Sequence, residues 1–186
     1  MYLTQITVSN TDLQRRHISD NYRWKQEINK SVLHPRFRLY EEEETTRVLL
    51  FSPGIPQKLP WGNWGVNNRV PGNYHDYDRY IFSLRANTTF KEYKKGGNGP
   101  RHPTKDIQKW IERKAKLHGF KIVNFEMIPL GKQISYKGRK PITHYAVDFD
   151  GVLEVTDRAK FKLAALKGIG PAKAFGFGLL LLKIIN

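Results

Sequence analysis

The stretch Gly168-Ile169-Gly170-Pro171-Ala172-Lys173-Ala174-Phe175-Gly176-Phe177-Gly178, which continues into Leu179-Leu180-Leu181-Leu182, decides the fold of this chain. Its four glycines lack a Cβ, so the backbone can reach positive φ and approach a ligand closely. Successive free N–H groups in such a loop can bind phosphate, and Lys173 adds a charge. A turn that only lets its neighbours pack closely would have the same composition, and both interpretations stay open.

The sequence predicts the secondary structure on either side of this loop. Residues 157–167 carry apolar side chains at three- and four-residue steps after a Thr156/Asp157 cap signal, which predicts a short helix ending at Gly168. Residues 177–185 form an apolar run too short to cross a membrane, which predicts a buried central strand. The unit is helix, glycine loop and strand.

Composition narrows the class of protein. The chain has 186 residues and a formal net charge of +15, which attracts polyanions, nucleic acid first and an anionic membrane surface second. Aromatic residues make up 12%, which suits base stacking as well as a core. Cysteine is absent, and the six histidines form no metal-binding spacing, so we expect no metal and no cofactor. The amino terminus lacks a signal-peptide pattern, which indicates a cytoplasmic protein.

The first half predicts strand, helix, strand, strand. These are residues 2–8, 21–33, 36–41 and 47–52, with a polar linker over 9–20. Glu41 to Glu44 make an acidic turn that we interpret as a solvated hairpin tip. Residues 53–78 are rich in Pro, Gly and Asn and predict a loop with a short helix or strand inside it.

The second half predicts β-α-β-β-α-β, the ferredoxin-like order. Its strands are 80–87, 120–129, 142–153 and the last run, and its helices are 104–117 and 157–167. A basic, glycine-rich insert over 91–105 is expected to be mobile, and a basic hairpin spans 131–140. The predicted fold is therefore α+β, with tandem ferredoxin-like (RRM-like) domains at 1–76 and 77–186, a layout that RNA-binding proteins use.

Several runs together resemble the CasE-type CRISPR-associated endoribonucleases of the repeat-associated mysterious protein superfamily. They are Met1-Tyr2-Leu3, Asn21-Tyr22-Arg23-Trp24, Phe82-Ser83-Leu84-Arg85-Ala86-Asn87, Phe149-Asp150-Gly151-Val152-Leu153-Glu154-Val155 and the glycine loop. The resemblance implies an RNase with two ferredoxin-like domains that binds the CRISPR repeat hairpin. It implies metal-independent cleavage at the 3′ base of the stem by attack of the ribose 2′-OH. It also implies that the protein stays on the mature guide RNA as a subunit of the type I-E surveillance complex.

The main departure from the family pattern is at Lys25. The family's usual acid–base histidine follows the helix tyrosine, Tyr22, by three residues, where this chain has lysine. Three hypotheses follow from this departure. In the first, Lys25 takes that role, either as a cation or as an acid–base group, and in the second His17 or His34 enters the active site instead. In the third hypothesis the protein is a weak or inactive binder of CRISPR RNA. Tyr22 is expected to hydrogen-bond the nucleophile or phosphate. The alternatives without a catalytic role are that Tyr22 is an ordinary core tyrosine and that Lys25 is a solvated lysine on the helix surface.

The resemblance and the placement of charge together predict the RNA contacts. The RNA-binding candidates are Arg85, Lys109, Arg113, Lys132, Lys137, Arg139, Lys140, Gly168, Gly170, Lys173 and Gly176. For Arg85, a salt bridge within the core is the competing interpretation. The set predicts an affinity that falls steeply with salt. A generic basic RNA-binding module and a membrane-surface protein are weaker hypotheses, the latter because no long amphipathic helix is apparent.

Overall fold

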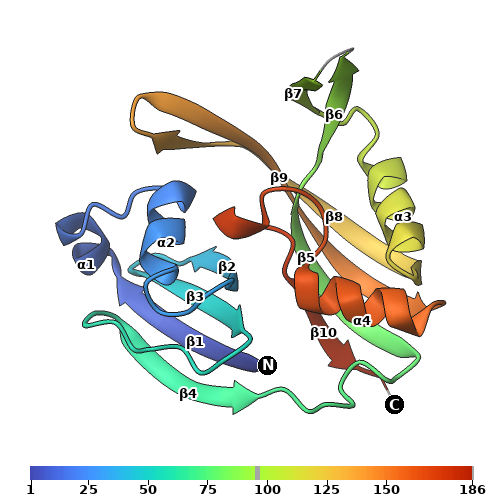
Figure 1. Cartoon of the computed structure of the whole chain (residues 1–186), viewed down its shortest axis with the longest axis horizontal. Coiled ribbons are helices and arrows are strands. Elements are labelled where there is room, and N and C mark those ends of the chain that lie inside the picture. Colours follow the sequence, from blue (N-terminus) through green and yellow to red (C-terminus); the bar gives the residue numbers. More distant parts are fainter. Residues whose placement is uncertain (95–96, 186) are drawn as a thin grey trace.

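The structure is a computed structural model that describes residues 1–94 and 97–185, without the side chains of 93–98 and 100. Two α+β domains lie side by side (Figure 1). The first contains β1 (Tyr2–Ser9), α1 (Asn10–Arg15), α2 (Asn21–Ile28), β2 (Arg36–Glu41), β3 (Thr45–Ser52) and β4 (Asn63–Arg69). The second contains β5 (Arg79–Asn87), β6 (Thr89–Lys94), β7 (Gly97–Pro103), α3 (Ile107–Leu117), β8 (Phe120–Lys137), β9 (Lys140–Val155), α4 (Arg158–Lys167), the 3₁₀ turn η1 (Lys173–Phe175) and β10 (Leu180–Ile184).

Both main sheets have the ferredoxin-like strand order, so the predicted fold class is confirmed. The first sheet runs β2-β3-β1-β4 and the second runs β10-β5-β9-β8, with every neighbouring pair antiparallel. In each domain the first and third strands are therefore central. The predicted domain boundary at 76/77 falls in the connection between β4 and β5.

The prediction was wrong about the segment between β1 and β2. Residues 10–15, expected as a linker, form α1, because the Ser9 hydroxyl caps it by accepting the amide of Asp12 at 3.1 Å. The helix expected to reach Leu33 ends at Ile28. The Ser31 hydroxyl donates to the Ile28 carbonyl at 2.7 Å, which terminates the helical hydrogen bonding.

A loop replaces the second ferredoxin-like helix of the first domain, all of whose residues are described. Residues 53–62 connect β3 to β4 without a helix, in line with the expected loop that holds one strand. Trp61 closes the core instead: it is buried and meets Trp24 of α2 edge to face, with ring centroids 6.2 Å apart.

The last strand is at an edge of its sheet, not at the centre as predicted. Its apolar run has another cause, because both faces are covered. Leu180 is buried in the second core, and Leu181 lines a hollow that it shares with Leu3 and Phe51 of the first domain. The position of this strand beside the first domain therefore explains why its sequence is as apolar as that of a central strand.

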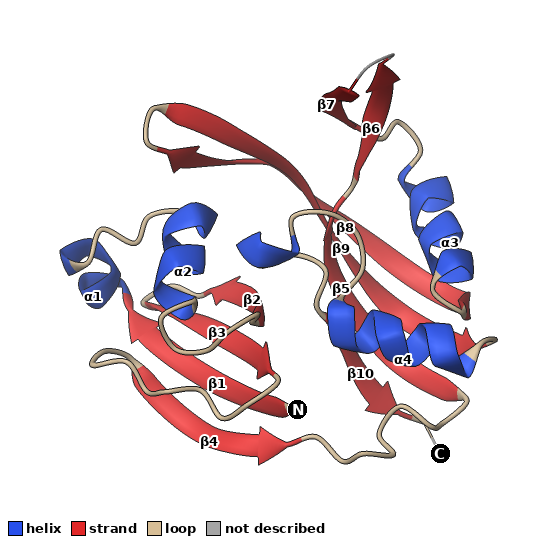
Figure 2. Ribbon diagram, viewed as in Figure 1, coloured by secondary structure: helices blue, strands red, loops and turns tan. Residues whose placement is uncertain are grey.

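Two basic segments form antiparallel pairs of strands. The insert expected to be mobile unless bound forms the two-stranded sheet β6-β7, while residues 95 and 96 lie outside the described part of the chain. The predicted basic hairpin over 131–140 is the end of β8 and β9, which stay paired as far as Lys137 and Lys140. Figure 2 shows the resulting long two-stranded arm reaching past the sheet toward the first domain.

Candidate functional site: the contact between helix α2 and the glycine loop

Helix α2 positions the two predicted catalytic residues against the glycine loop, where the two domains meet. Asp20 caps the helix, and its carboxylate accepts the amides of Tyr22 at 2.8 Å and Arg23 at 2.9 Å. Tyr22 and Lys25 are one turn apart, so they share a face of the helix. Both are half-buried, because that face looks toward η1 of the glycine loop.

Phe175 of the glycine loop completes this group. Its ring centroid is 6.2 Å from that of Tyr22, and the Lys25 Nζ lies 5.1 Å from the Phe175 centroid and 5.6 Å from the Tyr22 centroid. The Asn21 side-chain amide also donates to the Phe175 carbonyl at 2.9 Å. Two aromatic rings therefore hold the ammonium by cation–π contact, and Lys25 has no carboxylate partner among the described residues.

The two histidines proposed as substitutes lie elsewhere. His17 is exposed after α1, and His34 is exposed beyond the end of α2, each with positive φ. Their main-chain positions do not bring them to the face of α2 that carries Tyr22. The geometry therefore favours Lys25 over either histidine.

A third histidine, His144 of β9, lies against the glycine loop and was missed by the sequence analysis. Only 3% of it is exposed, and its ring centroid is 5.0 Å from both Phe175 and Phe177. The Asn87 amide faces Nδ1 at 3.4 Å, and Nε2 has no hydrogen-bond partner in the described part of the chain. Burial lowers the pKa of His144 to about 4, so the ring is neutral at physiological pH.

The two-stranded arm of β8 and β9 adjoins the same end of α2. The amide of Tyr136 donates to the free oxygen of the Asp20 carboxylate at 3.0 Å, so one side chain joins the arm to the helix cap. The four predicted arm cations are all exposed and make no ion pair with any carboxylate that the structure describes: Lys132, Lys137, Arg139 and Lys140. They are free to meet an external anion.

The Arg85 side chain makes its hydrogen bonds at the interface between the domains. Its guanidinium makes two bonds of 2.8 Å to Asp148 and donates to the Leu39 carbonyl of β2 at 2.8 Å. Arg38 of the first domain shares this carboxylate at 3.2 Å and donates to Ser83 at 2.6 Å. This is the core salt bridge that competed with an RNA contact, and we do not place Arg85 among the proposed RNA contacts.

The predicted glycines have a packing reason for their identity. A Cβ on Gly176 would lie 3.0 Å from Phe37 of β2, and one on Gly170 would lie 3.2 Å from the Trp110 ring of α3. Both have positive φ, and Gly168 with φ of 75° ends α4. The loop thus seats against both domains. This geometry supports the packing interpretation of the glycines and leaves their contact with RNA a prediction.

The remaining predicted cations divide between two environments. Lys109 of α3 is 83% exposed and pairs with Asp106 at 3.2 Å. Arg113 and Lys173 line a hollow that holds several cations and no carboxylate. Burial, and then the charges of Arg36, Lys114 and Lys167, lower the pKa of Lys173, which indicates that cations are crowded here.

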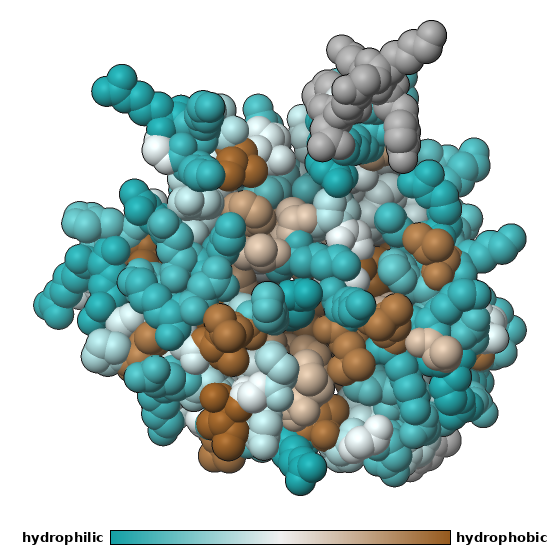
Figure 3. Space-filling model, viewed as in Figure 1, coloured by the Kyte–Doolittle hydropathy of each residue, from teal (hydrophilic) through white to brown (hydrophobic). Residues whose placement is uncertain are grey.

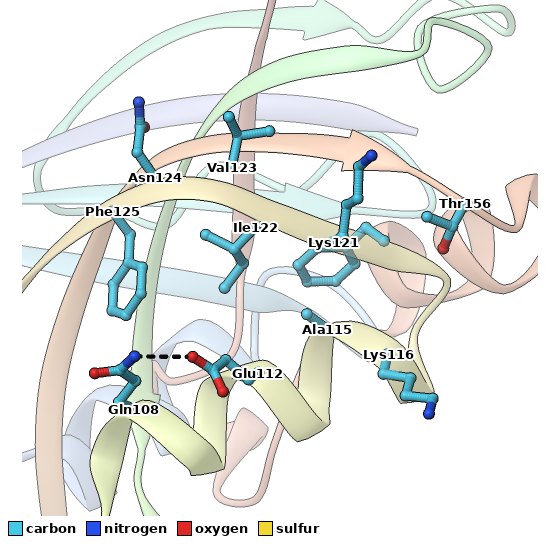
Figure 4. Close-up of a pocket in the computed structure, with 11 residues that line it drawn as sticks. Gln108, Glu112, Ala115, Lys116, Lys121, Ile122, Val123, Asn124, Phe125 and Thr156 are labelled. Carbon is cyan, nitrogen blue, oxygen red and sulfur yellow. Dashed lines mark hydrogen bonds between the residues drawn. The ribbon is translucent and has the colours of Figure 1, made fainter.

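A second hollow, between α3 and the edge strand β8, has a different character (Figure 4). Apolar side chains such as Ile122 and Phe125 form its wall, and Glu112 accepts a hydrogen bond from Gln108 at 3.0 Å. Lys121 on its rim is paired with Glu154 at 2.8 Å. Its charges are balanced, so it lacks the attraction for phosphate that the cation-lined hollow has.

Hydrophilic residues cover most of the face seen in Figure 3, and hydrophobic ones occur in small separate groups. Among the described residues, no helix has the length and apolarity needed to span a membrane. Within the same residues, no three His, Asp or Glu side chains come together as a candidate metal cluster.

Comparison with known proteins decides the family. Residues 1–183 match the family described as CRISPR associated protein. The chain belongs to this CRISPR-associated family. It is 26% identical to the CRISPR-associated endoribonuclease Cse3 of Thermus thermophilus, over 97% of this chain and 98% of the relative.

Solved structures of CRISPR-associated proteins share the fold. A structure of CRISPR endoribonuclease Cse3 bound to a 19-nucleotide RNA has a TM-score of 0.80 at 23% identity, covering 99% of this chain and all of that one. Cas6e from Escherichia coli K-12 has a TM-score of 0.78 at 23% identity over the full length of both chains. A chain of a CRISPR RNA-guided surveillance complex has a TM-score of 0.71 at 20% identity, again over both full lengths. The resemblance to CasE-type proteins is thereby confirmed.

Proposed function

We propose that this protein is an endoribonuclease that binds the stem–loop of a CRISPR repeat RNA and cuts at the 3′ base of the stem. The observation that carries the proposal is the convergence of Tyr22, Lys25 and Phe175 at the root of a cationic arm. The relative named as a CRISPR-associated endoribonuclease matches over nearly the whole chain, which supports the same activity.

The chemistry uses groups that the chain itself supplies, together with water. The ribose 2′-hydroxyl loses its proton to a water molecule as its oxygen attacks the neighbouring phosphorus, the bond from phosphorus to the 5′-oxygen breaks, and negative charge builds on the phosphorane. The Lys25 ammonium stabilises that charge and is the proton source for the departing 5′-oxygen, while the Tyr22 hydroxyl hydrogen-bonds the nucleophile or the phosphate. Attack of water on the resulting 2′,3′-cyclic phosphate gives the 3′-phosphate. The products are a 2′,3′-cyclic phosphate or 3′-phosphate and a free 5′-OH.

The arm supplies the grip on the stem. Lys132, Lys137, Arg139 and Lys140 carry four exposed positive charges on one two-stranded projection, which suits the groove of a hairpin and its flanking phosphates. The protein then stays on the mature guide RNA as a subunit of a type I-E surveillance complex. Its likeness in fold to chains of such complexes supports this role.

A second candidate function is that of a guide-RNA-binding subunit with weak or no cleavage activity. The observation that favours it is the lysine at position 25, since no histidine contacts Tyr22 or Lys25 within the described residues. The RNA grip would be unchanged in such a protein.

The test is incubation of the purified protein with a labelled repeat hairpin in EDTA, beside the same RNA with a 2′-deoxy substitution at the scissile position. We expect one cut that disappears in the deoxy RNA. Tight binding without any cut would replace the nuclease by the binding subunit. Equal affinity for unrelated hairpins would contradict both.

A further inference from the structure

A hollow lined by cations adjoins the glycine loop at Gly170, Pro171 and Lys173. The cationic pocket is formed by Phe90 of β6, Arg101 of β7, Arg113, Lys114 and His118 at the end of α3, and Lys173 of the glycine loop. It has a volume of about 680 Å³, which is enough for a nucleotide-sized ligand.

Four cations of the cationic pocket have no carboxylate partner in the part of the chain that the structure describes. Arg101, Arg113, Lys114 and Lys173 make no ion pair with any described carboxylate, and no acidic residue lines the pocket. Burial, followed by repulsion from Arg113 and Arg101, lowers the pKa of Lys114. Burial and then the charges of Lys114 and Lys173 likewise lower the pKa of His118. Folding therefore holds like charges together at a cost that a bound anion would offset.

An exposed aromatic ring stands at the same place. Phe90 is 42% exposed, and its ring centroid lies 5.7 Å from that of the His102 ring. Proteins that bind single-stranded nucleic acid combine a positive groove with aromatic side chains on which bases stack. A base inside a duplex cannot stack in this way, so the combination selects an unpaired nucleotide.

The pocket and the candidate catalytic residues share one loop. Lys173 faces the pocket, and Phe175, two residues later, contacts Tyr22 and Lys25. The three-residue turn η1 therefore joins the cationic pocket to the place where Tyr22 and Lys25 lie.

We propose that the cationic pocket binds an unpaired RNA nucleotide next to the repeat hairpin, with its phosphates on Arg101, Lys114 and Lys173 and its base on Phe90. The inference rests on the proposed function, because it assumes that the hairpin binds beside Tyr22 and Lys25. It assigns the β6-β7 insert to the single-stranded flank and the β8-β9 arm to the stem.

The test compares affinities for three non-cleavable RNAs, each with a 2′-deoxy scissile position: the minimal hairpin, the hairpin with a few nucleotides added 5′, and the hairpin with a few added 3′. We expect one extension to tighten binding by roughly five- to tenfold, the worth of about one stacked base. The extension that does so identifies which flank enters the pocket. The salt dependence should also steepen, by about 0.7 in log–log slope for each added phosphate contact.

Two variants locate the gain. Phe90→Ala and Arg101→Ala should abolish it while leaving affinity for the minimal hairpin at the wild-type value, and Phe90→Tyr should keep it because the ring remains. Arg15→Ala, which removes an exposed charge from α1 in the other domain, is the control for net charge and should keep the gain. Thermal melts check that each variant is folded.

Several outcomes would overturn the inference. The first is that neither extension increases the affinity. The second is that the increase survives both Phe90→Ala and Arg101→Ala. The third is that Arg15→Ala removes the increase as fully as those two variants do. In each of these cases the hairpin still binds, and the proposed function stands. Failure of the wild-type protein to bind the minimal hairpin would overturn the proposed function itself.

Discussion

Two groups of cations in this molecule differ in one respect, the presence of a carboxylate. At the domain interface, Arg38 and Arg85 share Asp148, Arg38 also donates to the Ser83 hydroxyl, and Arg85 also donates to the Leu39 carbonyl. In the cationic pocket, Arg101, Arg113, Lys114 and Lys173 crowd together with no acidic residue among them. The first group contains a countercharge that its two arginines share, and the second has none among the residues that line it.

The difference separates structural charge from functional charge. A buried arginine that is paired within the protein stabilises one arrangement of the two domains, and losing its partner leaves an uncompensated charge. A half-buried lysine with only cationic neighbours destabilises the free protein slightly and is satisfied by a ligand. Removing a charge should therefore have opposite consequences in the two places.

The largest expected effect is on the group that shares Asp148. Asp148→Ala leaves Arg38 and Arg85 facing each other without a countercharge, and we expect a loss of about 3–5 kcal/mol in the free energy of unfolding. Urea denaturation measures it. Asp150→Ala, an exposed aspartate on the same strand, is the matched control and should change stability by less than about 0.5 kcal/mol. Similar losses in the two variants would remove the distinction.

The next effect concerns Lys25, which lies against Tyr22 and Phe175. Lys25→Ala should lower the cleavage rate about 10²-fold or more, while hairpin affinity barely changes, because Lys25 acts on charge that develops in the transition state. Single-turnover cleavage separates rate from binding. Lys25→His should keep or raise activity and move the pH–rate profile toward a pKa near ~6.5. Unchanged turnover in Lys25→Ala would exclude this residue from the mechanism.

The third effect concerns His144, which is buried and uncharged at neutral pH. Its folded-state pKa of about 4 is below the ordinary value of about 6.5, so between these values the unfolded chain binds more protons. Its contribution is therefore complete above pH 6.5 and is lost as the pH falls toward 4. We expect the wild type to lose about 2 kcal/mol more than His144→Gln between pH 6.5 and 4.5 in urea unfolding. Parallel pH dependences would show that His144 does not titrate there.

The smallest effect is on the group in the cationic pocket. Lys114→Ala should change the free energy of unfolding by less than about 1 kcal/mol, because relief of cation repulsion offsets the lost contact with the Trp110 ring, 5.6 Å away. The same variant should weaken binding of the extended hairpin. Thermal melts and a titration measure the two quantities. A large loss of stability would mean that Lys114 is a structural residue like Arg85.

Local sequence patterns predicted most of the fold. Alternating and helical spacings identify β1, β2, β3, β5, α3 and α4, and the repeated order of elements identifies two ferredoxin-like units. The errors came where tertiary context decides. β10 reads as a central strand because the first domain covers its second face, and α1 was hidden because nothing in it is buried.

The site was predictable only in part, for a related reason. The resemblance singled out Tyr22 and Lys25, which the structure places against Phe175. Arg85 could not be assigned, since its partner Asp148 is 63 residues away and only the folded sheet brings the two together. His144 gave no signal, because a lone histidine in a strand is usually a core residue.

The carboxylate of Asp20 has a consequence for where an RNA is cut. One of its oxygens caps the helix that carries Tyr22 and Lys25, and the other receives the Tyr136 amide of the arm. The Asp20 carboxylate therefore helps to hold the arm at a set distance from Lys25, together with the Asn21 amide, which donates to Gln133 of the arm at 3.5 Å. Under the proposed function, the distance from the stem to Lys25, and not the bases at the cut, would then set the position of cleavage.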